Sequence, residues 1–195
     1  MSKGILTAVI GALCLLALSP AQAFDEQGWV PGTTHMVLDA GLGFGGDKLV
    51  TVVYTNGDTK TIYAGDGLFA DFGVQHNFVD TDWSFKATAG FDTWAASGSN
   101  ADVTFTRYPV DLLALYTIGY NHIGFGLTEH LSPKLDLDGL GPNATFDPAT
   151  GVIVQYQYWL FGVRLTSIRY KVSNGCASGC TINGNSLGFF FNYVF

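Results

Sequence analysis

Apolar side chains alternate with small or polar ones along most of this chain. In residues 38–45, leucine, alanine and phenylalanine alternate with aspartate and glycine, and residues 68–76 and 83–92 repeat the scheme. A period of two is the signature of an extended strand, because successive side chains of a strand point to opposite faces. Each segment is therefore predicted to form a strand with one bulky apolar face and one small or polar face.

Eight such segments are predicted, joined by connectors that are alternately short and long. The short connectors are expected at 79–82, 117–120 and 159–161, and the long ones at 96–101, 133–150 and 174–185. Asn56-Gly57-Asp58 predicts the tip of a first hairpin, and Pro109, which cannot donate to a ladder, predicts a bulge or bend. The strands are expected near 36–54, 60–78, 83–95, 102–116, 121–132, 151–159, 162–173 and 186–195.

The balance of residue types favours a barrel whose bulky face meets lipid. Hydrophobic residues make up 48% of the chain, charged residues only 13%, and the mean hydropathy is +0.25. A soluble sandwich would expose a charged face, whereas here the polar face is rich in Gly, Thr, Asp and Gln, which suits a narrow lumen. The sequence therefore predicts an all-β fold, a closed eight-stranded antiparallel transmembrane β-barrel. Aromatic residues near strand ends suit interfacial girdles, namely Tyr108, Tyr116, Tyr120, Tyr158 and Trp159.

Charge excludes one class of partner. The formal net charge is −7 with nine scattered Lys and Arg residues, whereas nucleic-acid binding needs clustered cations. After residue 24 no run of 18 apolar residues occurs, so membrane-spanning helices are not expected.

The first 23 residues read as a secretory signal peptide. Lys3 supplies a positive start, residues 5–18 form an apolar run, and Ala21-Gln22-Ala23 matches a cleavage site. Cleavage is predicted between Ala23 and Phe24, which leaves 24–195 as the barrel domain. The apolar run is too short for a membrane anchor.

Two cysteines remain in the mature chain. Cys176 and Cys180 close a short glycine-rich segment, and in an oxidising exported compartment they are expected to form a disulfide. A zinc site is the weaker interpretation, because no second pair of ligands lies nearby.

The last strand carries the most specific pattern. Leu187, Phe189, Phe191, Tyr193 and Phe195 alternate on one face, and the sequence ends on that phenylalanine. This pattern resembles the terminal assembly signal of bacterial outer-membrane barrels, carried here by Phe189, Phe191, Tyr193 and Phe195.

The chain as a whole resembles the OmpA-like small outer-membrane β-barrel superfamily. The resemblance covers the mature chain and lies in Tyr108-Pro109-Val110-Asp111-Leu112-Leu113, in residues 124–134 (GFGLTEHLSPK) and in residues 183–188 (NGNSLG). It implies an outer-membrane location reached through the periplasm, contact with outer-membrane lipid and lipopolysaccharide, and delivery by the barrel assembly machinery. The peptidoglycan-binding domain of OmpA itself has no counterpart here.

Several charged residues fall on the face assigned to the lumen. A lumen too narrow for a continuous water column favours an internal salt-bridge and hydrogen-bond network over an ion pathway. The residues of this predicted network are Asp39, Asp71, Lys86, Asp92, Arg107, Asp111 and Arg164.

Two further patterns resemble functional sites. His130, Ser132 and Glu129 could form a serine-activating set like that of outer-membrane lipid A deacylases, but Glu129 points to the opposite face from His130. His122, on the face of His130, is expected to be a hydrogen-bonded lumen residue. The loop with Asp136, Asp138, Asn143 and Asp147 lacks the register of a calcium loop.

The sequence thus predicts a monomeric, non-enzymatic barrel with four outward loops and three periplasmic turns. Its expected role is structural, in envelope integrity, or interactive, through its surface loops. A narrow channel for small or hydrophobic solutes is the alternative, and a lipid A-modifying enzyme is third. No cofactor and no metal are expected.

Overall fold

The structure is a computed structural model that describes residues 30–54, 56–97, 102–138, 141–174 and 180–195. The predicted signal peptide, with its cleavage point at Ala23 and Phe24, lies outside these residues. Within the described residues, no helix is both long and apolar enough to cross a membrane.

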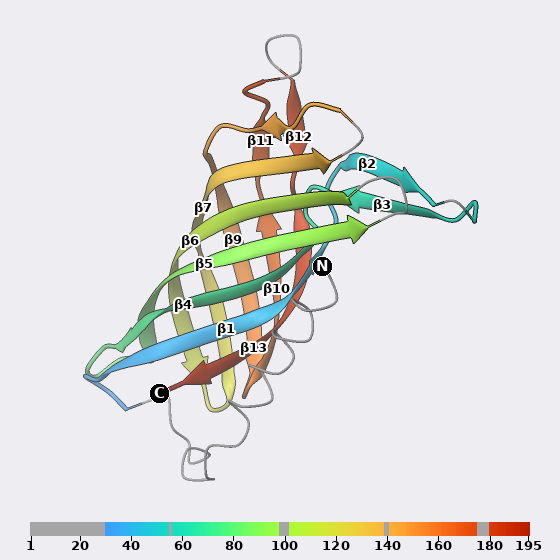
Figure 1. Ribbon diagram of the computed structural model, residues 1–195. Helices are drawn as coiled ribbons and strands as arrows, with labels where there is room; N and C mark the ends of the chain where they lie inside the picture. Colours follow the sequence, from blue (N-terminus) through green and yellow to red (C-terminus); the bar gives the residue numbers. More distant parts are fainter. Residues whose placement is uncertain (1–29, 55, 98–101, 139–140, 175–179) are drawn as a thin grey trace.

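Eight long strands close into an antiparallel barrel (Figure 1). Round the barrel their order is β6, β5, β4, β1, β13, β10, β9 and β7, and pairing of β6 with β7 closes the ring. The predicted closed eight-stranded antiparallel barrel is therefore confirmed. The strands are β1 (Thr34–Phe44), β4 (Gly67–Asn77), β5 (Trp83–Ser97), β6 (Asp102–Ile118), β7 (Asn121–Asp138), β9 (Ala149–Tyr158), β10 (Phe161–Ser167) and β13 (Ser186–Val194).

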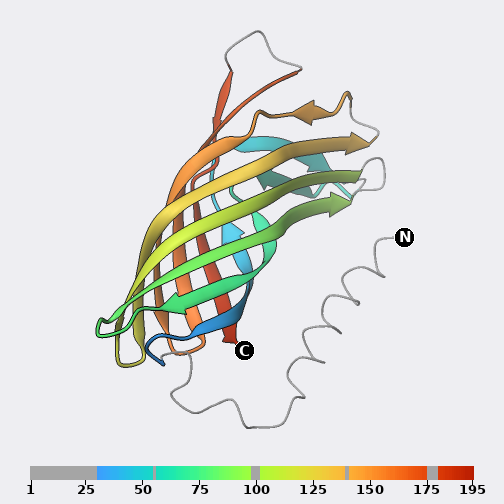
Figure 2. The same cartoon turned by 90° about the vertical axis from the view of Figure 1, so that its left-hand side faces the viewer.

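Short strands extend the barrel at one end only. β2 (Lys48–Val53) and β3 (Thr59–Tyr63) form a hairpin that projects sideways in Figure 1. β8 (Ala144–Thr145) pairs with β7, and β11 (Arg169–Lys171) pairs with β12 (Thr181–Asn183). This end carries all the long connections and is here named the loop end. The opposite, turn end has three short connections (Figure 2).

The turns at the turn end use residues with a left-handed backbone. Asp80, Gly119 and Trp159 have φ of 57°, 58° and 54°, values that the tight connections require. The predicted turns at 79–82, 117–120 and 159–161 contain these three residues.

Four sequence-based boundaries were wrong. The predicted strand at 162–173 is divided into β10 and β11, because β11 leaves the barrel ring to pair with β12. The first two predicted strands are each divided, because the chain leaves the barrel at Gly45 and Gly46, whose φ values of 130° and 82° break the strand, and returns at Gly67. The Asn56-Gly57-Asp58 tip is the turn of the β2–β3 hairpin, as predicted. In addition, β7 continues to Asp138, so the predicted loop at 133–150 is shorter.

Pro109 lies beside an irregular part of the β6–β7 pairing. Thr106 pairs with Lys134 but Tyr108 pairs with Leu131, so two residues of β7 oppose Arg107 alone. One of these two residues, Ser132, has a φ of 47°. The bulge that Pro109 predicted is therefore present, on the neighbouring strand.

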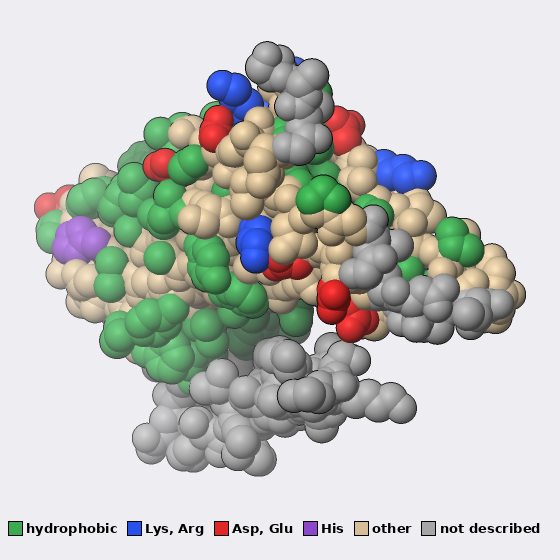
Figure 3. All heavy atoms as spheres, turned by 45° about the horizontal axis from the view of Figure 1, so that its top comes forward, with side chains coloured by type: hydrophobic (Ala, Val, Ile, Leu, Met, Phe, Trp, Pro, Cys, Tyr) green, Lys and Arg blue, Asp and Glu red, His purple; other side chains and the backbone are tan. Residues whose placement is uncertain are grey.

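The two faces of the wall differ in chemistry as the alternation predicted. Space-filling atoms in Figure 3 show hydrophobic side chains over the barrel wall and charged ones gathered toward the loop end. Outward side chains that are more than one-third exposed include Leu42, Phe72, Phe91, Leu112, Phe125, Val154, Leu165 and Phe189. A contiguous apolar surface of this kind needs an apolar environment.

Candidate functional site

All seven residues of the predicted lumen network are buried inside the barrel. None has a relative exposure above 7%. They come from β1, β4, β5, β6 and β10, and the barrel's closure brings them together from distant parts of the sequence. Four are acids and three are bases, so nearly every charge has a partner of opposite sign available.

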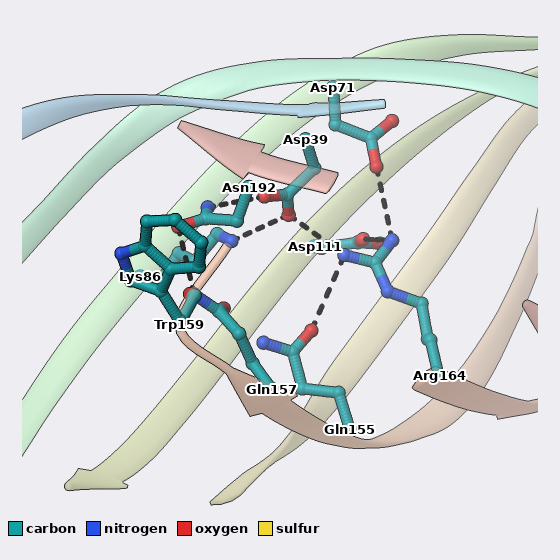
Figure 4. A network of polar contacts seen from close by, with 9 residues as sticks. All are labelled: Asp39, Asp71, Lys86, Asp111, Gln155, Gln157, Trp159, Arg164 and Asn192. Atoms are coloured by element: carbon teal, nitrogen blue, oxygen red, sulfur yellow. Dashed lines mark hydrogen bonds and ion pairs between the residues drawn. The ribbon is translucent and has the colours of Figure 1, made fainter. Parts of the chain in front are cut away.

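Arg164 is the centre of this network (Figure 4). Its Nη1 atom lies 3.1 Å from Asp71 Oδ2 and 3.1 Å from Asp111 Oδ2, and its Nη2 atom lies 3.0 Å from Asp39 Oδ2. The guanidinium carbon lies 5.2 Å from the ring centroids of both Phe69 and Phe190. The guanidinium of Arg164 thus contacts one carboxylate from each of three other strands. A buried charge requires such partners of opposite sign.

Asp39 links Arg164 to a second group of residues nearer the turn end. Lys86 Nζ donates to Asp39 Oδ2 at 2.5 Å, and Asn192 Nδ2 donates to Asp39 Oδ1 at 2.6 Å. Gln157 Nε2 then donates to Asn192 Oδ1 and to the carbonyl oxygen of Trp159 in the last turn. Asn192, Gln155 and Gln157 were missed by the sequence analysis, although they alternate with outward residues on strands already recognised.

Arg107 forms a separate cluster closer to the loop end. Its Nη2 atom lies 2.7 Å from Asp92 Oδ2, and its Nε also donates to that oxygen. Nη1 and Nη2 donate to the carbonyl oxygens of Ala64 and Asp66, at 2.6 and 3.1 Å. These carbonyls belong to the segment that joins the β2–β3 hairpin to β4, so Arg107 fastens the hairpin to the barrel wall.

A cavity of about 30 Å³ separates the Arg107 and Arg164 clusters. Asp71, Asp92, Asp111 and Thr128 line it, and each has a buried side-chain oxygen with no hydrogen-bond partner among the described residues. A polar cavity of this volume accommodates about two water molecules. It is far smaller than the roughly 300–1,000 Å³ of a small-molecule pocket.

An apolar cluster closes the lumen above Arg107. It combines residues of the β2–β3 hairpin with residues from the loop-end parts of β5, β6, β7, β9 and β11, and it is here named the loop-end cluster. The rings of Phe105, Phe146 and Tyr170 lie within 6.0 Å of one another. Its buried members are Val52, Ile62, Ala64, Ala96, Val103, Phe105, Leu135, Phe146, Ala149, Ile168 and Tyr170.

Tyr170 connects this cluster to the lumen. Its hydroxyl forms a 2.6 Å hydrogen bond with Nδ1 of His130. Burial raises the pKa of the Tyr170 hydroxyl to about 12, and the nearby Arg107 guanidinium opposes part of this rise. The hydroxyl is therefore neutral and structural at ordinary pH.

The His130, Ser132 and Glu129 set does not assemble. His130 is buried in the lumen, whereas Glu129 and Ser132 are exposed. His130 pairs with Tyr170 rather than with Ser132. His122 lies on the lumen face of β7, and its Nδ1 atom forms a 2.8 Å hydrogen bond with Thr117 Oγ1.

The acidic residues of the predicted 133–150 connector are spread apart, partly on β7 and partly beyond it. Asp136 forms an ion pair with Lys134 at 2.6 Å on an exposed part of β7. Asn143 accepts a hydrogen bond from the Leu137 amide, and Asp147 lies 3.9 Å from Lys171. Among the described residues, no group of three or more His, Cys, Asp or Glu residues could hold a metal ion.

The remaining predicted sites are a cysteine just before β12 and the aromatic residues of β13. Cys180 is disulfide-bonded, and Cys176, its predicted partner, lies outside the described residues. Phe189, Phe191, Tyr193 and Phe195 share the outward face of the last strand and its end, with a 4.8 Å contact between the rings of Tyr193 and Phe195. Their recognition by assembly machinery stays a prediction.

Comparison with known proteins gives structural similarity to a solved barrel. No family model matches the sequence, and no curated protein matches it. The chain is similar to the crystal structure of Ail, the attachment invasion locus protein of Yersinia pestis, in complex with the heparin analogue sucrose octasulfate. The identity is 13%, the match covers 84% of this chain and 100% of that chain, and the TM-score is 0.48. Identity at this level does not indicate a shared ligand, and the OmpA-like resemblance stays a prediction.

Proposed function

We propose that this protein is a small outer-membrane barrel with a sealed lumen, which acts through its outer surface and loop end rather than by transport or catalysis. The observation that carries the proposal is the filled interior: a charged network, a cavity of about 30 Å³ and the loop-end cluster occupy the lumen in succession. Membrane insertion is supported by the apolar outward face, because a closed barrel leaves no unpaired backbone edge in hydrocarbon.

The channel alternative would need a continuous polar path. In this barrel the path from the turn end meets Arg164, which is held by three carboxylates, and then the apolar loop-end cluster. An ion that crosses the lumen would have to displace both Arg164 and the loop-end cluster. The filled lumen therefore favours a structural or surface-contact role.

An enzyme acting on lipid A is disfavoured for a geometric reason. A serine needs a base within hydrogen-bond reach, and the imidazole of His130 lies inside the barrel against Tyr170 while Ser132 lies outside. Mass spectra of lipid A from cells with the protein and with its His130→Ala variant should be identical.

The proposed location and orientation can be tested with inserted epitopes. Gly57 lies at the hairpin tip with no heavy atom within 4 Å of an added Cβ, so an epitope inserted there should be tolerated and should be stained on intact cells. The same epitope in the 119–120 turn should be stained only after the outer membrane is permeabilised. Equal staining of both in intact cells, or recovery of the protein in the soluble periplasmic fraction, would contradict the proposal.

A further inference from the structure

A groove of about 440 Å³ runs across the outer face of β9, β10 and β13 near the loop end. Its floor includes Thr166 and Ser186, which pair across β10 and β13. Its walls are apolar, with a polar margin toward the loop end. The walls and margin comprise Val152, Val154, Leu165, Leu187, Ser167 and Asn185.

The paired residues of these strands explain why the groove lies where it does. One row across the three strands contains Phe191, Phe161 and Tyr158. The next rows toward the loop end shrink first to Phe189, Val163 and Tyr156, then to Leu187, Leu165 and Val154. The groove therefore lies where the outward side chains are smaller than those of the aromatic row beside it.

A cation stands at the loop-end side of the groove. Along β10 and β11 the outward residues are Leu165, Ser167 and Arg169, while Ile168 and Tyr170 point inward. At roughly 3.3 Å per residue, Arg169 begins about 13 Å beyond Leu165 on the same face. Arg169 is exposed and has no ion-pair partner among the described residues. Lys171, two residues further on, lies 3.9 Å from Asp147.

We infer that the groove and Arg169 form a binding site for a phosphorylated lipid of the outer leaflet. One acyl chain lies in the groove, the polar margin of Ser167 and Asn185 meets the headgroup, and Arg169 binds its phosphate. The complementarity is specific, because the surface changes from apolar to polar to cationic in the order in which such a lipid changes from chain to headgroup to phosphate. Guanidinium groups bind phosphate through charge-assisted hydrogen bonds. The inference rests on the proposed outer-membrane location.

Native mass spectrometry of the folded full-length mature protein in detergent, titrated with diphosphoryl lipid A, tests the site. The wild-type protein should bind one lipid saturably. Leu165→Trp fills the groove from an outward position, and Arg169→Gln removes the cation, and each should weaken binding roughly tenfold. Val74→Trp, outward on β4, and Lys134→Gln, a loop-end cation on β7, serve as matched controls and should bind like the wild type.

Two comparisons separate the parts of the site. Lipid A stripped of its phosphates should bind the wild type and Arg169→Gln equally weakly, and inorganic phosphate should not compete. The wild-type protein could insert into lipid bilayers and yet bind diphosphoryl lipid A no better than Leu165→Trp and Arg169→Gln. That result would overturn the proposed lipid site but not the proposed barrel. A chain that does not insert into bilayers at all would overturn the proposed function, and the site with it.

Discussion

Arg164 is the residue on which most of the lumen's charge balance depends. It is buried, and its guanidinium contacts Asp39, Asp71 and Asp111 on three other strands. Its removal leaves Asp71 and Asp111 buried without a cation, although Asp39 keeps Lys86. An uncompensated buried charge costs more than the ion pair itself contributes.

We therefore expect Arg164→Met to lower the free energy of unfolding by about 3–5 kcal/mol. Urea titration in lipid bilayers, followed by tryptophan fluorescence, measures this loss. Lys134→Met, which removes an exposed ion pair with Asp136, should cost less than about 1 kcal/mol. Equal losses in the two variants would mean that the lumen network does not stabilise the barrel.

Ionisation of Tyr170 should lower the stability of the folded protein at high pH. Its pKa in the folded protein is about 12, whereas an unfolded tyrosine ionises near pH 10. The fold's preference for the neutral hydroxyl is therefore fully present below pH 10 and is lost as the pH rises from 10 to 12. This loss amounts to about 3 kcal/mol for a shift of two pKa units.

The Tyr170→Phe variant should be less stable than the wild type at pH 8, because it lacks the hydrogen bond to His130. Its stability should then decline less steeply between pH 10 and 12. Urea midpoints measured at several pH values give both slopes. Parallel declines would show that Tyr170 ionises in the folded state as readily as in the unfolded state.

Among the elements, the β2–β3 hairpin depends on contacts made from the barrel. Val52 and Ile62 pack in the loop-end cluster, and Arg107 binds the carbonyl oxygens of Ala64 and Asp66. Lys60 of β3 also donates to the carbonyl oxygen of Ala95 on β5, at 3.1 Å. The hairpin is thus fixed to the barrel by one apolar face and two cations.

Arg107→Leu should loosen the hairpin without opening the barrel ring, because the strand ladders do not use this side chain. Limited proteolysis of the folded protein should cut the variant between Asp47 and Asp66 several times faster than the wild type. Lys48→Gln, an exposed cation at the start of β2, should be cut at the wild-type rate. An unchanged rate for Arg107→Leu would mean that the apolar contacts and Lys60 hold the hairpin without Arg107.

The sequence predicted the strands of this fold, but not the contacts between them. Alternation gave the strands and their faces, and so placed Asp39, Arg107 and Arg164 in the lumen. It could not give partners, because the fact that Arg164 meets Asp39, Asp71 and Asp111 depends on strand tilt and ring closure. The loop-end cluster was missed for a related reason. Phe146 lies in the predicted connector at 133–150, Ile168 and Tyr170 lie in the predicted strand at 162–173, and only the folded loop end brings them together.

For the whole molecule, we infer that the lumen of the barrel is sealed. Its eight strands leave a narrow lumen, which the charged network, a cavity of about 30 Å³ and the loop-end cluster occupy in succession. The outer wall, with its apolar belt and the groove beside Arg169, then remains as the surface through which the protein can act.

Single-channel recording of the refolded protein in a planar bilayer tests this claim most directly, with a heat-modifiable gel band to verify folding. We predict no conductance steps from the folded wild-type protein. A triple variant that removes side chains from the charged network and from the loop-end cluster should produce small openings if it retains the gel shift. Its substitutions are Phe105→Ala, Arg107→Ala and Arg164→Ala. Reproducible steps from the folded wild-type protein would contradict the sealed barrel and favour a channel.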